Sequence, residues 1–368
     1  MRIETDIKLD YNDVLIRPKR STLTSRFDVD MNRTYTFRHS QKKWTGVPIM
    51  ASNMDTVGTF EMAKSLHEFD MVTCIAKHYN TEWRWTGEMP ERAYNTSICV
   101  VGGISDEDID NIEKIYYQYN TPFVGLDVAN GYTINFVDSV KKLRNRLPDA
   151  TIIAGNVVTA DMTQELILAG ADIIKVGIGP GSICTTRVVA GVGMPQFSAV
   201  YKVSQFCNSA GVPVIADGGI RHSGDAVKAL GAGAECVMLG SLFAGVDESP
   251  GEPFLYNGRS FKSVRGMGSL AAMVEGGKAR YGQAGVSEQQ KLVPEGIEGM
   301  VPSRGPVAPF VYQFVGGIRS GMGYLGAKDL EVFRSRASFV RITGAGVQEN
   351  HPHDVQVTKE APNYWKTN

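Results

Sequence analysis

Short apolar runs recur along the chain at regular intervals. Eight of them are rich in Val and Ile and continuous rather than alternating, which is typical of parallel strands buried on both faces. They occupy residues 47–53, 71–76, 97–103, 122–128, 151–157, 173–179, 213–219 and 236–242. The segments between them have room for helices, and amphipathic spacing marks residues 59–69, 106–119, 132–147, 160–169 and 223–230.

This alternation of strand and helix predicts an α/β fold. Eight β-then-α units favour a TIM (β/α)8 barrel. The runner-up is a doubly wound open sheet, which is less favoured because no strand is followed by a GxGxxG phosphate loop. In a barrel, catalytic groups come from the carboxyl ends of the strands, so that end is where the chemistry is expected.

The pattern changes after the eighth run. Residues 246–306 are rich in Gly, Glu, Pro and Gln, and they form a segment far longer than an ordinary loop. Such a segment at the catalytic end of a barrel predicts a flap over the active site or, as the alternative, a disordered segment. Residues 308–325 then predict a closing helix, and a short strand-like piece begins at Phe339. We expect one catalytic domain over residues 1–368.

Composition and charge exclude some classes of partner. Hydrophobic residues make up 43% of the chain and charged residues 21%, as in a globular protein with a sizeable core. A net charge of -1 gives no electrostatic footprint for nucleic acid or an anionic membrane. No run is long enough to span a bilayer, and residues 1–6 lack a signal-peptide pattern. The five cysteines are odd in number and none has CxxC spacing, which predicts reduced thiols in a cytoplasmic protein.

Polar residues gather where the apolar runs end. Taken singly, each is better explained as a turn residue or a helix cap. Taken together, at one end of a barrel, they predict the lining of a pocket. They are Asn53, Asp55, Lys77, His78, Asp127, Asn130, Asn156, Lys175, Asp217, Gly240 and Ser241.

One cysteine differs from the others. Cys74, Cys99 and Cys236 lie in apolar runs and Cys207 in a helical pattern, so packing explains them. Cys184 instead lies in the glycine-rich loop 177–187, just beyond the sixth run. Glycines let the backbone approach a ligand closely, and the positive charge of a nearby Arg187 is expected to favour the nucleophilic thiolate. The alternative is a flexible loop with an incidental cysteine.

Two further loops suit a phosphate group. Asp217-Gly218-Gly219 follows the seventh run and Gly240-Ser241 follows the eighth. The loops after these two strands form the usual phosphate site of TIM barrels, through backbone N–H groups and a helix amino terminus. Either motif alone is a common turn, but the pair in these positions predicts a phosphate site.

Several longer segments carry a family resemblance over essentially the whole chain. They are 53–60, 154–159, the Cys184 loop, 215–219 and 265–269. With these segments the chain resembles the family of IMP dehydrogenase and GMP reductase. Both enzymes bond the loop cysteine to carbon 2 of a purine nucleotide. One oxidises IMP with NAD and hydrolyses the adduct; the other expels ammonia from GMP and reduces the adduct with NADPH.

The resemblance implies a role for each matching residue. The catalytic set would be Cys184, Thr186 and Glu295. The substrate set would be Ser52, Met54, Ser182, Asp217, Gly218, Gly219, Gly240, Ser241, Gly266, Met267 and Gly268. The dinucleotide side would use Lys77, Asp127, Asn156 and Lys175, with Asn156 also beside the base. Carbonyls of Gly179, Gly181 and Cys184 resemble the family's monovalent-cation site for K⁺, with Glu349 of a neighbouring subunit completing it in a homotetramer.

The resemblance is divided between the two branches. The amino-terminal half resembles the reductases and the carboxy-terminal half the bacterial dehydrogenases. Dehydrogenases resemble one another in a flap arginine and tyrosine that activate water, and we match these positions to Met300 and Ser303, which cannot do so. Arg304 is adjacent and could stand in. Val264 stands where dehydrogenases have a tyrosine that contacts the phosphate.

These matches favour the reductase branch, NADPH-dependent deamination of GMP to IMP, with Thr186 and Glu295 protonating the departing amine. The stretch 79–127 has no room for the regulatory insertion common in dehydrogenases, which agrees weakly. Two alternatives stay open. One is an IMP dehydrogenase with an atypical flap, and the other is an inactive purine-nucleotide sensor.

Overall fold

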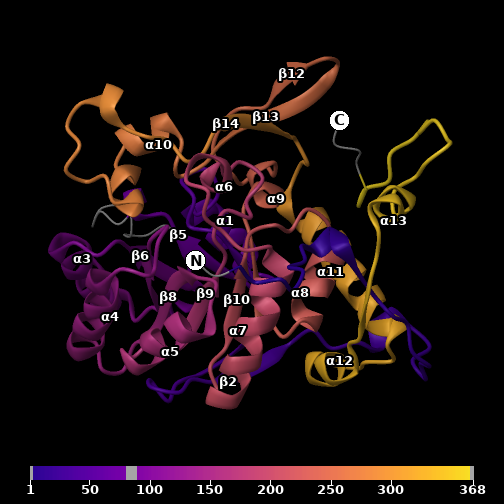
Figure 1. The fold of residues 1–368 in the computed structure, drawn as a ribbon, viewed down its shortest axis with the longest axis horizontal. Coiled ribbons are helices and arrows are strands. Elements are labelled where there is room, and N and C mark those ends of the chain that lie inside the picture. Colours follow the sequence, from indigo (N-terminus) through magenta and orange to yellow (C-terminus); the bar gives the residue numbers. More distant parts are fainter. Residues whose placement is uncertain (1–2, 80–88, 365–368) are drawn as a thin grey trace.

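In a computed structural model, which describes residues 3–79 and 89–364, eight parallel strands close into a barrel. The hydrogen-bonded order is β10-β11-β4-β5-β6-β7-β8-β9, so each strand pairs with its neighbour in the chain and β11 closes on β4 (Figure 1). The predicted TIM barrel is confirmed. The strands are β4 Ile49–Ala51, β5 Val72–Ile75, β6 Ile98–Gly102, β7 Phe123–Asp127, β8 Thr151–Val157, β9 Ile173–Val176, β10 Val214–Asp217 and β11 Cys236–Leu239.

Helices cover the outside of the barrel. They are α1 Phe60–His67, α2 Glu91–Thr96, α3 Asp106–Tyr119, α4 Ile134–Arg146, α5 Ala160–Leu168, α7 Gln196–Ala210 and α8 Ser223–Gly231. All five helices expected from amphipathic spacing are present. Side-chain hydroxyls of Thr59, Ser105 and Thr133 accept the backbone N–H three residues on and so begin α1, α3 and α4. Residues 1–2 and 80–88 lie outside the described residues. Residues 80–88 are part of the stretch 79–127, which we expected to be too short for the regulatory insertion.

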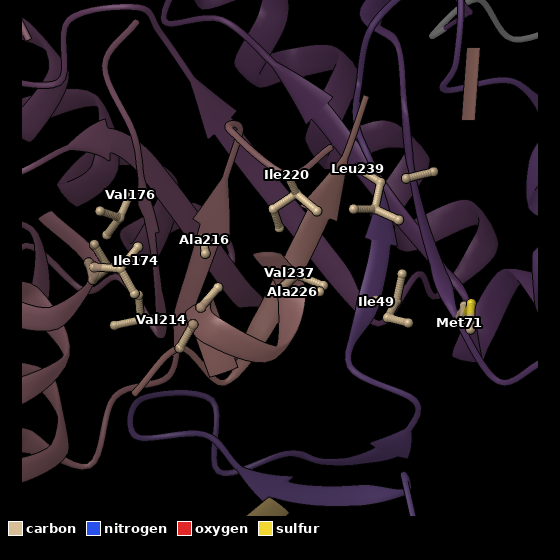
Figure 2. Packing of buried hydrophobic residues seen from close by; sticks show 14 of the residues in the cluster. Ile49, Met71, Ile174, Val176, Val214, Ala216, Ile220, Ala226, Val237 and Leu239 are labelled. Atoms are coloured by element: carbon tan, nitrogen blue, oxygen red, sulfur yellow. The ribbon is translucent and has the colours of Figure 1, made fainter. Parts of the chain in front are cut away.

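Alternate residues of each strand pack in two different places. Ile49 and Ala51 of β4 belong to the large core between the strands and the helices. Figure 2 shows part of this core, with labelled side chains from β9, β10, β11 and β4. Met50 of β4 points the other way, into a second cluster inside the barrel. Because both faces are buried, each strand reads as a continuous apolar run.

The amino-terminal end of the barrel is closed by a hairpin. Strands β2 Arg33–Thr36 and β3 Lys43–Gly46 pair antiparallel. Phe37 and Trp44 pack edge-on against Phe123, the first residue of β7, with ring centroids 5.7 and 5.8 Å away. Strand β1 Val14–Ile16 pairs with β15 Phe339–Arg341, which confirms the strand-like piece at Phe339. The hairpin was not predicted.

The flap has more structure than its composition suggests. Strands β12 Phe254–Tyr256, β13 Arg259–Arg265 and β14 Glu298–Pro302 form an antiparallel sheet. Between β13 and β14 lie α10 Leu270–Val274 and two 3-10 turns, η5 Gly277–Tyr281 and η6 Gln289–Lys291. Figure 1 shows these elements at the end of the barrel that also carries α6 Thr186–Val189 and α9 Ser241–Ala244. The flap therefore covers the carboxyl ends of the strands.

Beyond the flap the chain returns to the side of the barrel. Helix α11 Val307–Tyr324 matches the predicted closing helix and packs against α8. Helix α12 Leu330–Arg336 and the short α13 Gly344–Glu349 follow. Within the described ranges, no helix is long and apolar enough to cross a membrane.

Candidate active site

The cysteine loop, residues 177–187, connects β9 to α6 at the carboxyl end of the barrel. The loop begins at Gly177, whose φ is +151° and where a Cβ would lie 2.2 Å from the carbonyl oxygen of Asp217. Only glycine fits such a close approach in this conformation. Further on, the Cys184 N–H donates to the carbonyl of Gly181 at 3.1 Å and tightens the turn. The loop thus places Cys184 at the predicted end of the barrel.

The flap holds the cysteine loop through the backbone. The Thr185 N–H donates to the Glu295 carbonyl at 2.9 Å, and the Ile297 N–H donates to the Ile183 carbonyl at 3.0 Å. Between these two bonds, Cys184 and Gly296 face each other as an antiparallel bridge. This backbone clamp carries Glu295 to the cysteine loop although more than a hundred residues separate them.

The surroundings of Cys184 do not favour its thiolate. Burial and the negative charge of Asp217 raise the pKa of Cys184 above its ordinary value. The Gly181 backbone hydrogen bond and Arg187 act in the opposite direction but are outweighed. Arg187 is itself paired with Asp10 at 3.4 Å and donates to the Met194 carbonyl. Arg187 thus favours the thiolate, as expected, but desolvation and Asp217 outweigh it.

Cys184 lies in a cavity at the mouth of the barrel, the central cavity. Most residues that the sequence assigned to substrate line it together with Cys184 and Thr186. They are Ser52, Met54, Ser182, Asp217, Gly218, Gly219, Gly240, Ser241, Gly266 and Met267. Gly268 is beside this lining rather than in it, packed so tightly on Tyr281 that a Cβ there would lie 2.7 Å from the ring. Segments far apart in the chain therefore meet around the thiol.

A second hollow, the side cavity, adjoins the first. Its volume is about 740 Å³ against about 140 Å³ for the central cavity. Both Thr186 and Glu295 line it. Tyr132 also lines it, and its hydroxyl is 2.8 Å from that of Thr159 and accepts the Val158 N–H at 3.0 Å. The two cavities share Ala129, Ile178, Thr186, Arg280 and Tyr281. A ligand in one cavity is thus next to a ligand in the other.

Three of the residues expected on the dinucleotide side form a buried network beneath the central cavity. The Lys175 ammonium lies 2.8 Å from carboxylate oxygens of both Asp127 and Asp217. Asn156 Nδ2 donates to Asp217 at 2.8 Å. Asn156 and Lys175 line the central cavity, and none of the three lines the side cavity. Asp127, Asn156 and Lys175 thus lie together at or beneath the central cavity rather than at the side cavity.

Two other predicted site residues lie away from both cavities. Lys77, in the turn η3 Lys77–Tyr79, is 3.7 Å from Asp108 of α3. Glu349, at the end of α13, is paired with His353 at 3.2 Å. Within the described residues of this chain, neither Lys77 nor Glu349 lines the central or the side cavity. The role expected for Glu349 was to complete the cation site of a neighbouring subunit. Gly179, Gly181 and Cys184 do lie together in the cysteine loop, along the central cavity.

The flap places an arginine and a tyrosine that the sequence reasoning missed. Arg280 and Tyr281, in η5, line both cavities, and Arg280 is ion-paired with Asp127. Burial raises the pKa of Tyr281, so its hydroxyl stays protonated at neutral pH. By contrast, Met300 pairs with Ser263 in the flap sheet, and neither it nor Ser303 lines a cavity. The match of the water-activating positions to Met300 and Ser303 is not supported.

The other two flap positions considered in the sequence are also distant. Val264 is buried in β13 and lines neither cavity. The Arg304 guanidinium packs over the Phe310 ring, 5.4 Å from its centroid, and the Arg304 backbone N–H donates to the Gly245 carbonyl at 2.8 Å. Neither residue lines the central or the side cavity. The sequence signal for an arginine and a tyrosine together in the flap was the adjacent Arg280-Tyr281.

Comparison with known proteins gives the family. The model of the IMP dehydrogenase / GMP reductase domain matches residues 8–353. The chain belongs to this family. A GMP reductase of Caenorhabditis elegans is 46% identical over 363 residues, which is 98% of each chain. A GMP reductase of Citrobacter koseri is 47% identical over 346 residues, 93% of this chain and 97% of that protein.

The dehydrogenase branch of the family is also represented. An inosine-5'-monophosphate dehydrogenase of Halalkalibacterium halodurans is 59% identical over 266 residues, 72% of this chain. The chain spans 54% of the length of that protein. Identity is thus higher with the dehydrogenase and coverage is fuller with the reductases. Membership of the family does not by itself choose the branch.

Proposed function

We propose that the protein is a GMP reductase, which converts GMP to IMP and ammonia with NADPH. The observation that carries this proposal is the backbone clamp, which sets Glu295 against the cysteine loop at the point where Thr186 faces both cavities. Relatives named GMP reductase that match this chain over almost its full length support it.

The proposed chemistry begins in the central cavity. The Cys184 thiolate adds to C2 of GMP, and the bond between C2 and the amino nitrogen then breaks. Thr186, backed by Glu295, delivers the proton with which the amine leaves as ammonia. NADPH, if held by the lining of the side cavity, would supply the hydride that C2 needs for the C2–sulfur bond to break and release IMP and the thiolate. The Cys184 pKa is raised, so we expect the bound nucleotide or a neighbouring base to assist the ionisation.

The lining of each cavity fits its proposed ligand. Asp217 presents a carboxylate to the central cavity that can accept hydrogen bonds from ribose hydroxyls. Ser182, Gly219, Gly240 and Ser241 supply hydroxyls and backbone groups for the phosphate. The side cavity is roomier and mostly apolar, with hydroxyls from Tyr132, Thr133 and Thr159, as suits a dinucleotide.

The remaining expectations stay proposals of the same kind. The enzyme would act in the cytoplasm as a homotetramer of single-domain chains. Carbonyls of Gly179, Gly181 and Cys184, with Glu349 of a neighbouring subunit, would hold K⁺. Oxygen donors suit such a hard cation. The Gly181 carbonyl already accepts one N–H, but a carbonyl has a second lone pair to offer.

One observation favours a second candidate, IMP dehydrogenase. An arginine and a tyrosine are the groups that the family's dehydrogenases use to activate water, and Arg280 and Tyr281 lie where the two cavities meet. In this reaction Cys184 adds to C2 of IMP and NAD accepts the hydride. Water then hydrolyses the adduct to XMP. Both candidates use the same thiol on the same carbon.

One pair of assays separates the candidates. Absorbance of the reduced nicotinamide is followed with GMP plus NADPH and, separately, with IMP plus NAD. Loss of the signal in the first, with release of ammonia, supports the reductase. A gain in the second with none in the first overturns it in favour of the dehydrogenase. The C184A variant should be inactive in both assays while still binding IMP, and turnover by it would refute the covalent route.

A further inference from the structure

The buried network beneath the central cavity contains one shared cation. Lys175, on β9, is 3% exposed and lies 2.8 Å from Asp127 of β7 and 2.8 Å from Asp217 of β10. A Lys ammonium is a compact charge with three donors, so it can serve two carboxylates at once. With Arg280 as the second cation, the four charged groups sum to zero. Such balance is what a buried cluster of charges requires.

Its two carboxylates face different parts of the site. The Asp217 side chain is 19% exposed and lines the central cavity. It uses one oxygen, Oδ2, for both Lys175 and Asn156, which leaves Oδ1 for a ligand. The orientation of this carboxylate is therefore set from behind by the network.

Asp127, in contrast, is turned toward the flap. Its side chain is 3% exposed and lines neither cavity. It accepts from Asn53 Nδ2 at 2.7 Å and is ion-paired with Arg280 of the flap. Arg280 and its neighbour Tyr281 line both cavities. Asp127 thus holds this turn of the flap through its side chain, next to a backbone bond in which the Ala129 N–H donates to the Arg280 carbonyl at 3.0 Å.

We propose that Lys175 is a positioning residue shared by the two halves of the site, which orients Asp217 toward the nucleotide and Asp127 toward the flap arginine. Without its ammonium, Asp217 keeps only Asn156, and Asp127 and Asp217 repel each other across the barrel interior. The Lys175 ammonium therefore influences both the affinity for the nucleotide and the ion pair between Asp127 and Arg280. This inference rests on the proposed binding of a purine nucleotide in the central cavity, and it holds for either reaction.

The test compares K175M with two variants that each alter one branch of the network. Affinity for IMP, which is substrate or product in both candidate reactions, is measured by calorimetry. Release of the flap is measured as trypsin cleavage after Arg280, relative to cleavage after the exposed Lys359. We expect D217N to weaken IMP binding about tenfold or more with unchanged cleavage, because a ligand acceptor is altered. D127N should accelerate cleavage about fivefold or more with near-normal IMP binding, because a buried ion pair is broken.

K175M should show both effects at once. A K175M that changes only one readout, or neither, overturns the proposal, since a shared group must act on both. A K175M that merely lowers thermal stability, with wild-type IMP affinity and flap cleavage, overturns it as well. If the unbalanced charge prevents folding, K175M/D217N restores neutrality. Its flap should still be cleaved faster than that of D217N, and equal rates would refute the flap half.

If the proposed function is wrong, the same measurements give a different result from the one expected if only the role of Lys175 is wrong. If the wild-type protein does not bind IMP at all, the proposed nucleotide site falls, and the nucleotide half of this inference falls with it. If the wild-type binds IMP and K175M matches it in both readouts, only the role of Lys175 falls.

Discussion

Replacing Lys262 by methionine should open the flap at its base. Lys262 lies on β13 and is 2% exposed. Its ammonium donates to the carbonyls of Val246 at 2.9 Å, Ser249 at 2.6 Å and, weakly, Asp247 at 3.4 Å. Among the described residues, no carboxylate lies within ion-pair distance of it. The lysine therefore fastens the flap sheet to the segment that leaves the barrel after α9.

The size of the effect follows from the bonds lost. Methionine matches the length and volume of the lysine stem but leaves the Ser249 carbonyl without a donor, at about 1–3 kcal/mol. The Val246 carbonyl loses one of two donors and keeps the Ser249 N–H at 3.2 Å. Relief from burying an ammonium roughly offsets this second, smaller loss. We expect local opening of the flap to become easier by about 1–3 kcal/mol, which is about 5- to 150-fold in the opening equilibrium.

Hydrogen–deuterium exchange of the β13 and β14 amides measures this opening directly. The GMP reaction should slow in parallel, because Glu295 is carried on the same flap. K228M is the matched control. Lys228 is partly buried, and its ammonium donates to the Tyr11 carbonyl at 2.9 Å, but it lies on α8, away from the flap. An increase in β13 exchange below about threefold in K262M, or an equal increase in K228M, would refute the reasoning.

Three further predictions concern the reacting groups. The rate of Cys184 alkylation by iodoacetamide in the free protein should rise about tenfold per pH unit through neutrality without levelling off below pH 8, because the Cys184 pKa is raised and the thiolate is the reactive form. The D217N variant should be alkylated faster at pH 7. A plateau of the rate near neutral pH would contradict a raised Cys184 pKa. E295Q should lower kcat for the GMP reaction about a hundredfold or more while leaving the affinity for IMP nearly unchanged, and a loss of affinity alone would argue against a role in proton delivery. Y281F should leave the GMP reaction within about threefold of wild type, since no water is activated there; if the protein oxidises IMP instead, Y281F should slow that reaction about a hundredfold or more.

The barrel itself could be predicted because its cause is local. Strands buried on both faces must be apolar at every position, and the helices between them must show one apolar stripe, so both leave a pattern in the sequence. The flap sheet left no such pattern. Its strands are short and solvent-facing, and β13 alternates exposed with buried residues only over Lys262 and Val264. Their pairing depends on contacts between residues 259 and 302 rather than on local periodicity.

The candidate site was predictable where the chemistry lies in one loop. Glycine density and a cysteine at a strand end marked residues 177–187, and the loops after β10 and β11 marked the phosphate side. The match to Met300 and Ser303 was made along the sequence, which does not say which flap residues turn inward. Arg280 and Tyr281 line both cavities because of how the flap folds.

From the sequence alone one could predict the closed barrel, the end of it that carries the candidate site and the cysteine loop at that end, because strand period, strand number and loop composition are properties of neighbouring residues. Only the tertiary structure decided that Lys175 serves two carboxylates and that Glu295 is clamped to the cysteine loop. It likewise decided that Arg280 is held by Asp127. These contacts join residues dozens to more than a hundred positions apart. Their energies exist only once the barrel has brought the strand ends together, so no local pattern encodes them.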